Sequence, residues 1–125
     1  MVELAEKISD SELEVMRVLW DAGDALPITD IRRSLYERRG WEATTVKTLV
    51  QRLVSKGVLD QEKRKVFYYR PLVSEKEYND WAVSGLVRRL FRGSAKALVA
   101  TLVQSDGLSD ADLEELREMF RGAEE

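Results

Sequence analysis

The chain has 125 residues, of which 44% are hydrophobic and 34% charged, and its formal net charge is −3. It contains no cysteine and no histidine, which argues against disulfides, most metal sites and the commonest general base, so we expect no enzyme activity, metal or cofactor. The start MVELAEKISD is acidic and no apolar run is long enough to cross a membrane, so we expect a cytoplasmic protein without a membrane partner.

The first 40 residues predict two short helices. Ser9 and Glu12 have the spacing of a capping box, and apolar residues follow at helical intervals until Gly23 supplies a stop. A second helix is expected to begin at Pro27, because proline favours the first helical position, and to end near Gly40.

A third helix is predicted over residues 43–56, with Gly57 as its stop. Its apolar residues repeat at the intervals that place them on one side of a helix, namely Val46, Leu49, Val50, Leu53 and Val54. Three short helices with brief connections predict a compact helical core.

The pattern then changes to that of β-strands. Residues 58–61 and 66–69 are rich in β-branched and aromatic side chains, flank the charged tip 62–65, and are followed by Pro71. Three helices followed by a hairpin is the order of a winged helix-turn-helix, which we predict for residues 1–72. The fold class expected is mainly α with a small β-hairpin.

Residues 73–125 are predicted to be helical and too few to enclose a core. Residues 95–103 are nevertheless almost wholly apolar, so they must pack on the first domain or on a second chain. We favour a helical dimerisation domain, because two-fold symmetry suits a helix-turn-helix protein. The residues expected in the dimer contact are Trp81, Leu86, Leu90, Leu98, Val99, Leu102, Val103, Leu116 and Phe120.

Charge is distributed unevenly along the chain. Residues 31–70 carry eleven basic and four acidic side chains, a sum of +7, whereas the segments on either side are acidic. A local positive field attracts a polyanion even when the total charge is negative. Ordinary solvated helix faces are the alternative explanation of the same charges.

The polar side of the third helix has the residue types that contact DNA. An arginine here suits guanine and a glutamine suits adenine, while hydroxyl groups contact bases or phosphates. A plain exposed face is the alternative, but such a face is usually richer in glutamate. The candidate recognition-helix residues are Thr44, Thr45, Lys47, Thr48, Gln51 and Arg52.

Lys63, Arg64 and Lys65 at the hairpin tip are candidates for contact with phosphates or the minor groove. The same charges also serve to block edge-to-edge pairing of strands, which is the alternative. We predict double-stranded DNA as the partner. A winged-helix protein-interaction module without sequence-specific DNA binding is the alternative function.

Several linked stretches resemble one known family. ISDSELEVMRVLW, WEATTVKTLVQRLVSKGVL, KVFYYRPLVSEKEY and LVRRLFRGSAKALVATLVQSDGLSDADLEELREM occur in the order found in the penicillinase-repressor (BlaI/MecI) family of bacterial transcription regulators. The resemblance covers about residues 8–120. It implies a winged-helix homodimer that binds a palindromic operator and represses transcription, with the recognition helix at the residues named above.

The resemblance also implies a sensor protease as a further partner. In the β-lactam-responsive repressors, cleavage falls in the short apolar helix between an asparagine and a phenylalanine. Thr101 and Leu102 stand at those positions here, so they are the candidates for proteolytic control, although the cleaved pair itself is replaced.

Overall fold

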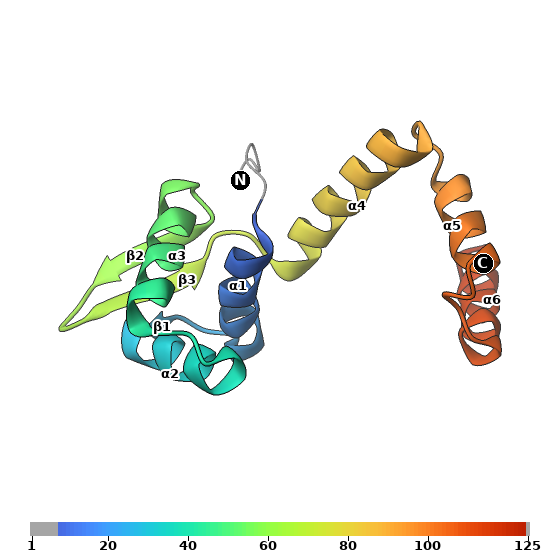
Figure 1. The fold of residues 1–125 in the computed structure, drawn as a ribbon. Helices are drawn as coiled ribbons and strands as arrows, with labels where there is room; N and C mark the ends of the chain where they lie inside the picture. The colour runs from blue at the N-terminus through green and yellow to red at the C-terminus, as the bar shows by residue number, and fades with distance from the viewer. Residues whose placement is uncertain (1–7, 125) are drawn as a thin grey trace. The chain divides into compact units, whose positions relative to one another are not determined.

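The computed structural model describes residues 8–124 and contains six helices and a small antiparallel sheet in that range (Figure 1). The chain divides into two compact units, Met1–Trp81 and Ala82–Glu125. The elements follow in the order α1 (Asp10–Ala22), β1 (Leu26–Pro27), α2 (Ile28–Arg39), α3 (Ala43–Ser55), β2 (Leu59–Lys63), β3 (Phe67–Pro71), α4 (Glu75–Phe91), α5 (Ala95–Gln104) and α6 (Asp110–Glu124).

The predicted ends of α1 and the predicted stop of α2 are confirmed, whereas α2 begins one residue later than predicted, because Pro27 is extended and belongs to β1. The Ser9 hydroxyl accepts a hydrogen bond of 3.1 Å from the Glu12 backbone N–H, and the Glu12 carboxylate accepts one of 2.8 Å from the Ser9 backbone N–H. Gly23 ends α1 with a φ of 73°, in the left-handed region that glycine adopts without strain. Pro27 precedes the first residue of α2, and Gly40 ends that helix.

The sheet contains one strand that the sequence did not predict. Its strand order is β1-β3-β2, and the two residues of β1, Leu26 and Pro27, pair with Tyr69 and Tyr68 of β3. Two residues are too few to display the alternation of a strand, so only the neighbouring strand defines β1.

The hairpin pairs farther toward its tip than predicted. Lys63 lies opposite Phe67, so β2 includes two residues that were expected in the turn, and the tip consists of residues 64–66. Charged side chains are acceptable in β2 here because this part of the strand is exposed. The hairpin extends beyond the helices in Figure 1.

The core of the first unit joins its three helices to the sheet and to the first turns of α4. Tyr78 of α4 is buried and its ring lies 6.0 Å from that of Trp20, so the beginning of α4 packs with α1. The mainly α fold with a winged helix-turn-helix is confirmed. The buried apolar residues are Ile8, Val15, Met16, Val18, Leu19, Ile31, Leu35, Val46, Leu49, Val50, Leu53, Val58, Leu59, Tyr69, Val73 and Tyr78.

The second unit has no comparable core. None of residues 82–123, whose exposure the structure describes, is buried. α5 and α6 lie side by side (Figure 1) and form an apolar groove of about 260 Å³. Its lining includes Val99 and Val103 of α5 and Leu113, Leu116 and Phe120 of α6.

Candidate nucleic-acid interface

The six candidate residues of α3 lie on its exposed side. Helical periodicity places the buried Val46, Leu49, Val50 and Leu53 against the core, so the intervening residues face solvent. This arrangement gives α3 one continuous polar side. All of the predicted recognition-helix residues are exposed there, namely Thr44, Thr45, Lys47, Thr48, Gln51 and Arg52.

Two cations on this face are available to an external anion. Neither Lys47 nor Arg52 forms an ion pair with any carboxylate in residues 8–124. The Thr48 hydroxyl donates to the Thr44 backbone oxygen at 3.0 Å, which holds its side chain against the helix. The exposed face of α3 therefore combines hydroxyls, an amide and unpaired positive charge.

The hairpin tip carries cations with different surroundings. The Arg64 guanidinium lies 4.2 Å from the centre of the Tyr68 ring and 3.4 Å from the Glu62 carboxylate. Lys63 and Lys65 have no carboxylate partner among the residues that the structure describes. All three predicted hairpin cations are exposed, but Glu62 already offsets part of the charge of Arg64.

Two arginines of α2 contact α1 instead of an external ligand. Arg38 bonds to Asp21 at 3.2 Å, and Arg39 bonds to Glu14 at 2.6 Å. These contacts account for part of the basic block found in the sequence. The partners are 17 and 25 residues apart, so no local pattern predicts them.

A part-buried ion pair connects α1 to the end of α3. The Lys56 ammonium group donates to the Glu12 carboxylate at 2.6 Å. Glu12 was identified from the sequence as a helix-capping residue, and Lys56 only as the end of the third helix. The sequence offers no signal for the pair, because its members are 44 residues apart.

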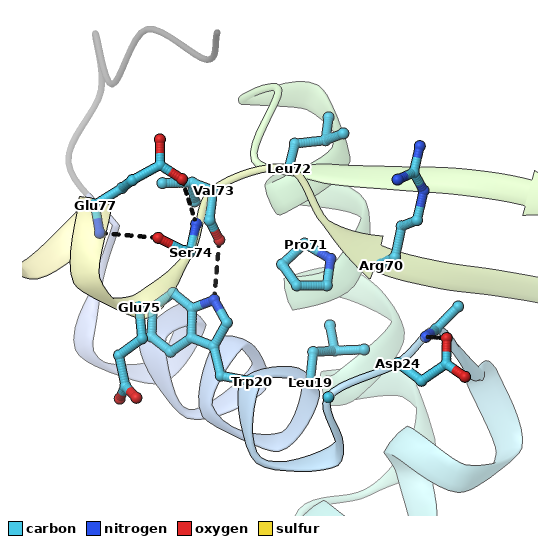
Figure 2. Close-up of a pocket in the computed structure, with 12 residues that line it drawn as sticks. Leu19, Trp20, Asp24, Arg70, Pro71, Leu72, Val73, Ser74, Glu75 and Glu77 are labelled. Carbon is cyan, nitrogen blue, oxygen red and sulfur yellow. Dashed lines mark hydrogen bonds between the residues drawn. The ribbon is translucent and has the colours of Figure 1, made fainter.

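A hollow of about 590 Å³ lies where α1, the end of β3 and the beginning of α4 meet (Figure 2). The Trp20 indole N–H donates to the Val73 oxygen at 3.0 Å and closes one side of it. Asp24, Glu75 and Glu77 contribute carboxylates to its lining, and Arg70 contributes a guanidinium that is already paired with Asp60. This acidic surface does not suit phosphate, and none of its lining residues comes from α3.

Comparison with known proteins agrees with the winged-helix fold. The model of the penicillinase repressor family matches residues 8–122. The chain belongs to this family. The family is one of transcriptional repressors and not of enzymes, so both the resemblance and the prediction that the chain is not an enzyme are confirmed.

Curated relatives match over most of their length. The penicillinase repressor of Bacillus licheniformis is 31% identical over 91% of this chain and 89% of its own. The methicillin resistance regulatory protein MecI of Mammaliicoccus sciuri is 32% identical over 91% of this chain and 93% of its own.

Two solved structures match the winged-helix part of the family. The DNA-binding domain of the repressor BlaI is 34% identical, with a TM-score of 0.55 over 62% of this chain and 94% of that domain. The Bacillus licheniformis BlaI monomeric form, solved in complex with the blaP half-operator, is also 34% identical, with a TM-score of 0.53 and the same coverages.

Residues that the sequence assigned to dimerisation lie on α4, α5 and α6. None of them is buried within the chain, and the exposed fractions of Leu90 and Phe120 reach 60% and 61%. Trp81 falls in the first unit, where its ring lies 5.8 Å from that of Tyr78. The exposed or half-exposed residues are Trp81, Leu86, Leu90, Leu98, Val99, Leu102, Val103, Leu116 and Phe120.

The candidate cleavage residues lie inside a helix. Thr101 and Leu102 are exposed on α5, where the Thr101 hydroxyl donates to the Ala97 oxygen at 2.9 Å.

Over the described part of the chain, no helix is both long and apolar enough to cross a bilayer.

Proposed function

We propose that this chain is a sequence-specific DNA-binding transcriptional repressor that acts as a homodimer on a palindromic operator. The observation that carries the proposal is the exposed side of α3, where threonine hydroxyls, Gln51, Lys47 and Arg52 form a surface without a carboxylate. These groups suit base edges and phosphates in a major groove. Membership of the penicillinase repressor family supports the same reading.

Each polar group of α3 has a distinct task in this proposal. Arg52 contacts guanine through two N–H groups, and Gln51 pairs with adenine. Lys47 contacts phosphate, while the hydroxyls of Thr44, Thr45 and Thr48 contact either phosphates or base edges. The relative BlaI was solved bound to half of an operator. By analogy, each subunit of this chain contacts one half-site.

The hairpin supplies contacts beside the recognition helix. Lys63 and Lys65 have no carboxylate partner in the described residues, so they are suited to phosphates. Arg64 lies over the Tyr68 ring and is suited to the edge of the minor groove. These contacts strengthen binding to any sequence, whereas α3 distinguishes one sequence from another.

The second unit joins two copies of the chain. None of residues 82–123 is buried within the chain, and α5 and α6 expose an apolar groove. A second copy of the chain is needed to cover this apolar surface. A symmetric dimer covers the same surface on both subunits and presents two α3 helices to the two halves of a palindrome. We assign dimerisation to the predicted residues of the second unit, with Trp81 adjoining them in the sequence, and DNA binding to residues 1–72.

The proposed location is the cytoplasm, with the protein at the nucleoid when it is bound to DNA.

A sensor protease that cuts between Thr101 and Leu102 separates part of the dimer surface from the winged helix. Cleavage there requires α5 to unwind, because both residues lie within the helix. A cut chain then loses the advantage of two linked half-sites.

Selection of bound sequences from a random duplex library, at about 150 mM salt to weaken phosphate attraction, tests the proposal. We expect a two-fold symmetric motif whose half-sites lie about one helical turn apart. A folded protein that enriches no motif contradicts sequence-specific binding and favours a protein-interaction module.

A further inference from the structure

Glu12 is the only charged side chain buried in the described part of the chain, with 1% of its surface exposed. One carboxylate oxygen, Oε1, accepts from the Lys56 ammonium at 2.6 Å and from the Ser9 backbone N–H at 2.8 Å. The other oxygen, Oε2, is also buried but accepts no hydrogen bond from the described residues. Capping alone does not require burial, because Glu77 performs the same task for α4 while exposed.

Lys56 is directed differently from the other lysine of this region. It follows the last residue of α3, and its backbone N–H donates to the Arg52 oxygen at 2.9 Å. Its side chain is only 19% exposed because its ammonium group reaches Glu12, whereas Lys47 is exposed. The pair thus fastens the last turn of α3, which carries Arg52, to the first turn of α1.

The pair is poorly explained as a source of stability. Removing two charges from water is costly, and replacing a buried ion pair by apolar groups is often neutral or stabilising. The unpartnered Oε2 adds to that cost. What an ion pair supplies instead is direction, because its geometry is narrow while the apolar contacts of the α3 stripe are non-directional.

We infer that Glu12 and Lys56 are positioning residues that fix the last turn of α3 against α1 and thereby place Gln51 and Arg52 for contact with bases. The inference rests on the proposed function. Hydrogen bonds to base edges tolerate small errors of distance and angle only, whereas attraction to phosphates tolerates larger ones. Loss of the pair therefore affects sequence preference before it affects general DNA binding.

The test is the double substitution Glu12→Gln with Lys56→Met in the full chain. The introduced amide retains the capping bond to Ser9, and the introduced thioether side chain retains the buried stem. Affinity is measured for the selected motif and for an unrelated duplex at several salt concentrations. The matched control is Asp21→Asn with Arg38→Met, which removes an exposed ion pair between α1 and α2.

For the double variant we expect a loss of about tenfold or more on the motif, comparable to one lost base contact. Affinity for the unrelated duplex, the salt dependence and the melting temperature should remain close to those of the original chain. The control variant should bind the motif normally. Lys56→Arg, which keeps a cation for Glu12, should retain most of the preference.

Three results overturn the inference. If the double variant prefers the selected motif as strongly as the original chain does, the pair does not position α3. If the double variant does not fold, the same comparison is made with Glu12→Gln alone. An equal loss on both duplexes, with a weaker salt dependence, makes Lys56 a phosphate contact instead. If the original chain itself shows no preference for any DNA sequence, the proposed function is wrong. That result is distinguishable from the other two, in which the original chain prefers the motif and only the role of Glu12 and Lys56 is contradicted.

Discussion

The two units of this chain differ in whether they can bury their own apolar residues. Every fully buried residue that the structure describes belongs to the first unit, whereas residues 82–123 contain none. Both units are largely helical and carry regularly spaced apolar residues, so helical pattern alone does not indicate a self-sufficient core. The difference predicts that the first unit folds alone and that the second is completed by another chain.

Removing the second unit is expected to have the largest effect on DNA binding. A chain that ends at Trp81 should be a folded monomer. Its affinity for a full operator should fall by a factor of about 10²–10⁴, because the two winged-helix domains that bind the half-sites are no longer linked. Sedimentation equilibrium and titration with full and half operators measure both effects. A dimer that survives this truncation contradicts the role given to the second unit.

A shorter truncation is the control for folding. A chain that ends at Leu72 also loses the Val73 oxygen that accepts from Trp20 and the buried ring of Tyr78. We expect it to melt at a lower temperature than the chain that ends at Trp81. Equal melting temperatures would mean that the beginning of α4 does not contribute to the first unit.

The core of the first unit makes an unpaired charge costly. Lys56→Met leaves the buried Glu12 carboxylate without its cation, and we expect about 3–5 kcal/mol less stability near pH 7. Urea unfolding of a chain that ends at Trp81 measures the change without the contribution of the second unit. A loss below about 1 kcal/mol would mean that solvent reaches the pair.

The pH dependence of that loss has a defined sign. Burial raises the pKa of Glu12, but the bonds from Lys56 and Ser9 outweigh burial and hold the pKa below its usual 4.5. In the original chain, Glu12 therefore adds stability above about pH 4.5, and this contribution is lost as pH falls through the folded-state pKa. In Lys56→Met the bond from Lys56 is lost while burial and the bonds from Ser9 remain, so we expect the pKa of Glu12 to be higher than in the original chain and the destabilisation to shrink on acidification.

A charge placed in the second unit should weaken dimerisation and leave the stability of the first unit unchanged. Val103→Asp introduces a carboxylate into the groove between α5 and α6, and we expect dimerisation to weaken by about 3 kcal/mol because both subunits change. Unfolding of the first unit should not change. Tyr36→Glu, at an exposed aromatic residue of the first unit, is the control that should leave the dimer intact.

The sequence predicted best what depends on neighbouring residues. The capping box of Ser9 and Glu12, the stop at Gly23 and the buried stripe of α3 all arise from hydrogen bonds or side chains within about four residues, so each leaves a local pattern. The polar side of α3 follows from the same periodicity, which is why all six of its candidate residues are exposed.

Contacts between distant segments left no such pattern. β1 exists only because β3 pairs with Leu26 and Pro27, and Lys56 meets Glu12 only after three helices have packed. The basic block illustrates the same point, because Arg38 and Arg39 pair with α1 while Lys47 and Arg52 do not. Net charge along the chain therefore overstates the charge available to DNA.

Arg52→Ala should change sequence recognition by the first unit without changing dimerisation by the second. We expect a loss of about 1–3 kcal/mol on the selected motif and a relaxed preference at one base position of each half-site. Sedimentation should still show a dimer. The measurement is a repeat of the sequence selection with the variant. Equal losses on the motif and on random DNA would contradict the assignment of Arg52 to a base.

The smallest expected effect compares two cations of the hairpin. Lys65→Ala should weaken binding to all sequences alike and reduce the slope of log affinity against log salt by about 0.9 per subunit, as loss of one phosphate contact does. Arg64→Ala should reduce the slope less, because Glu62 lies 3.4 Å from the guanidinium and already offsets part of its charge. Titrations at several salt concentrations measure both slopes. A larger change for Arg64 would mean that DNA displaces Glu62 and that the ion pair does not limit this arginine.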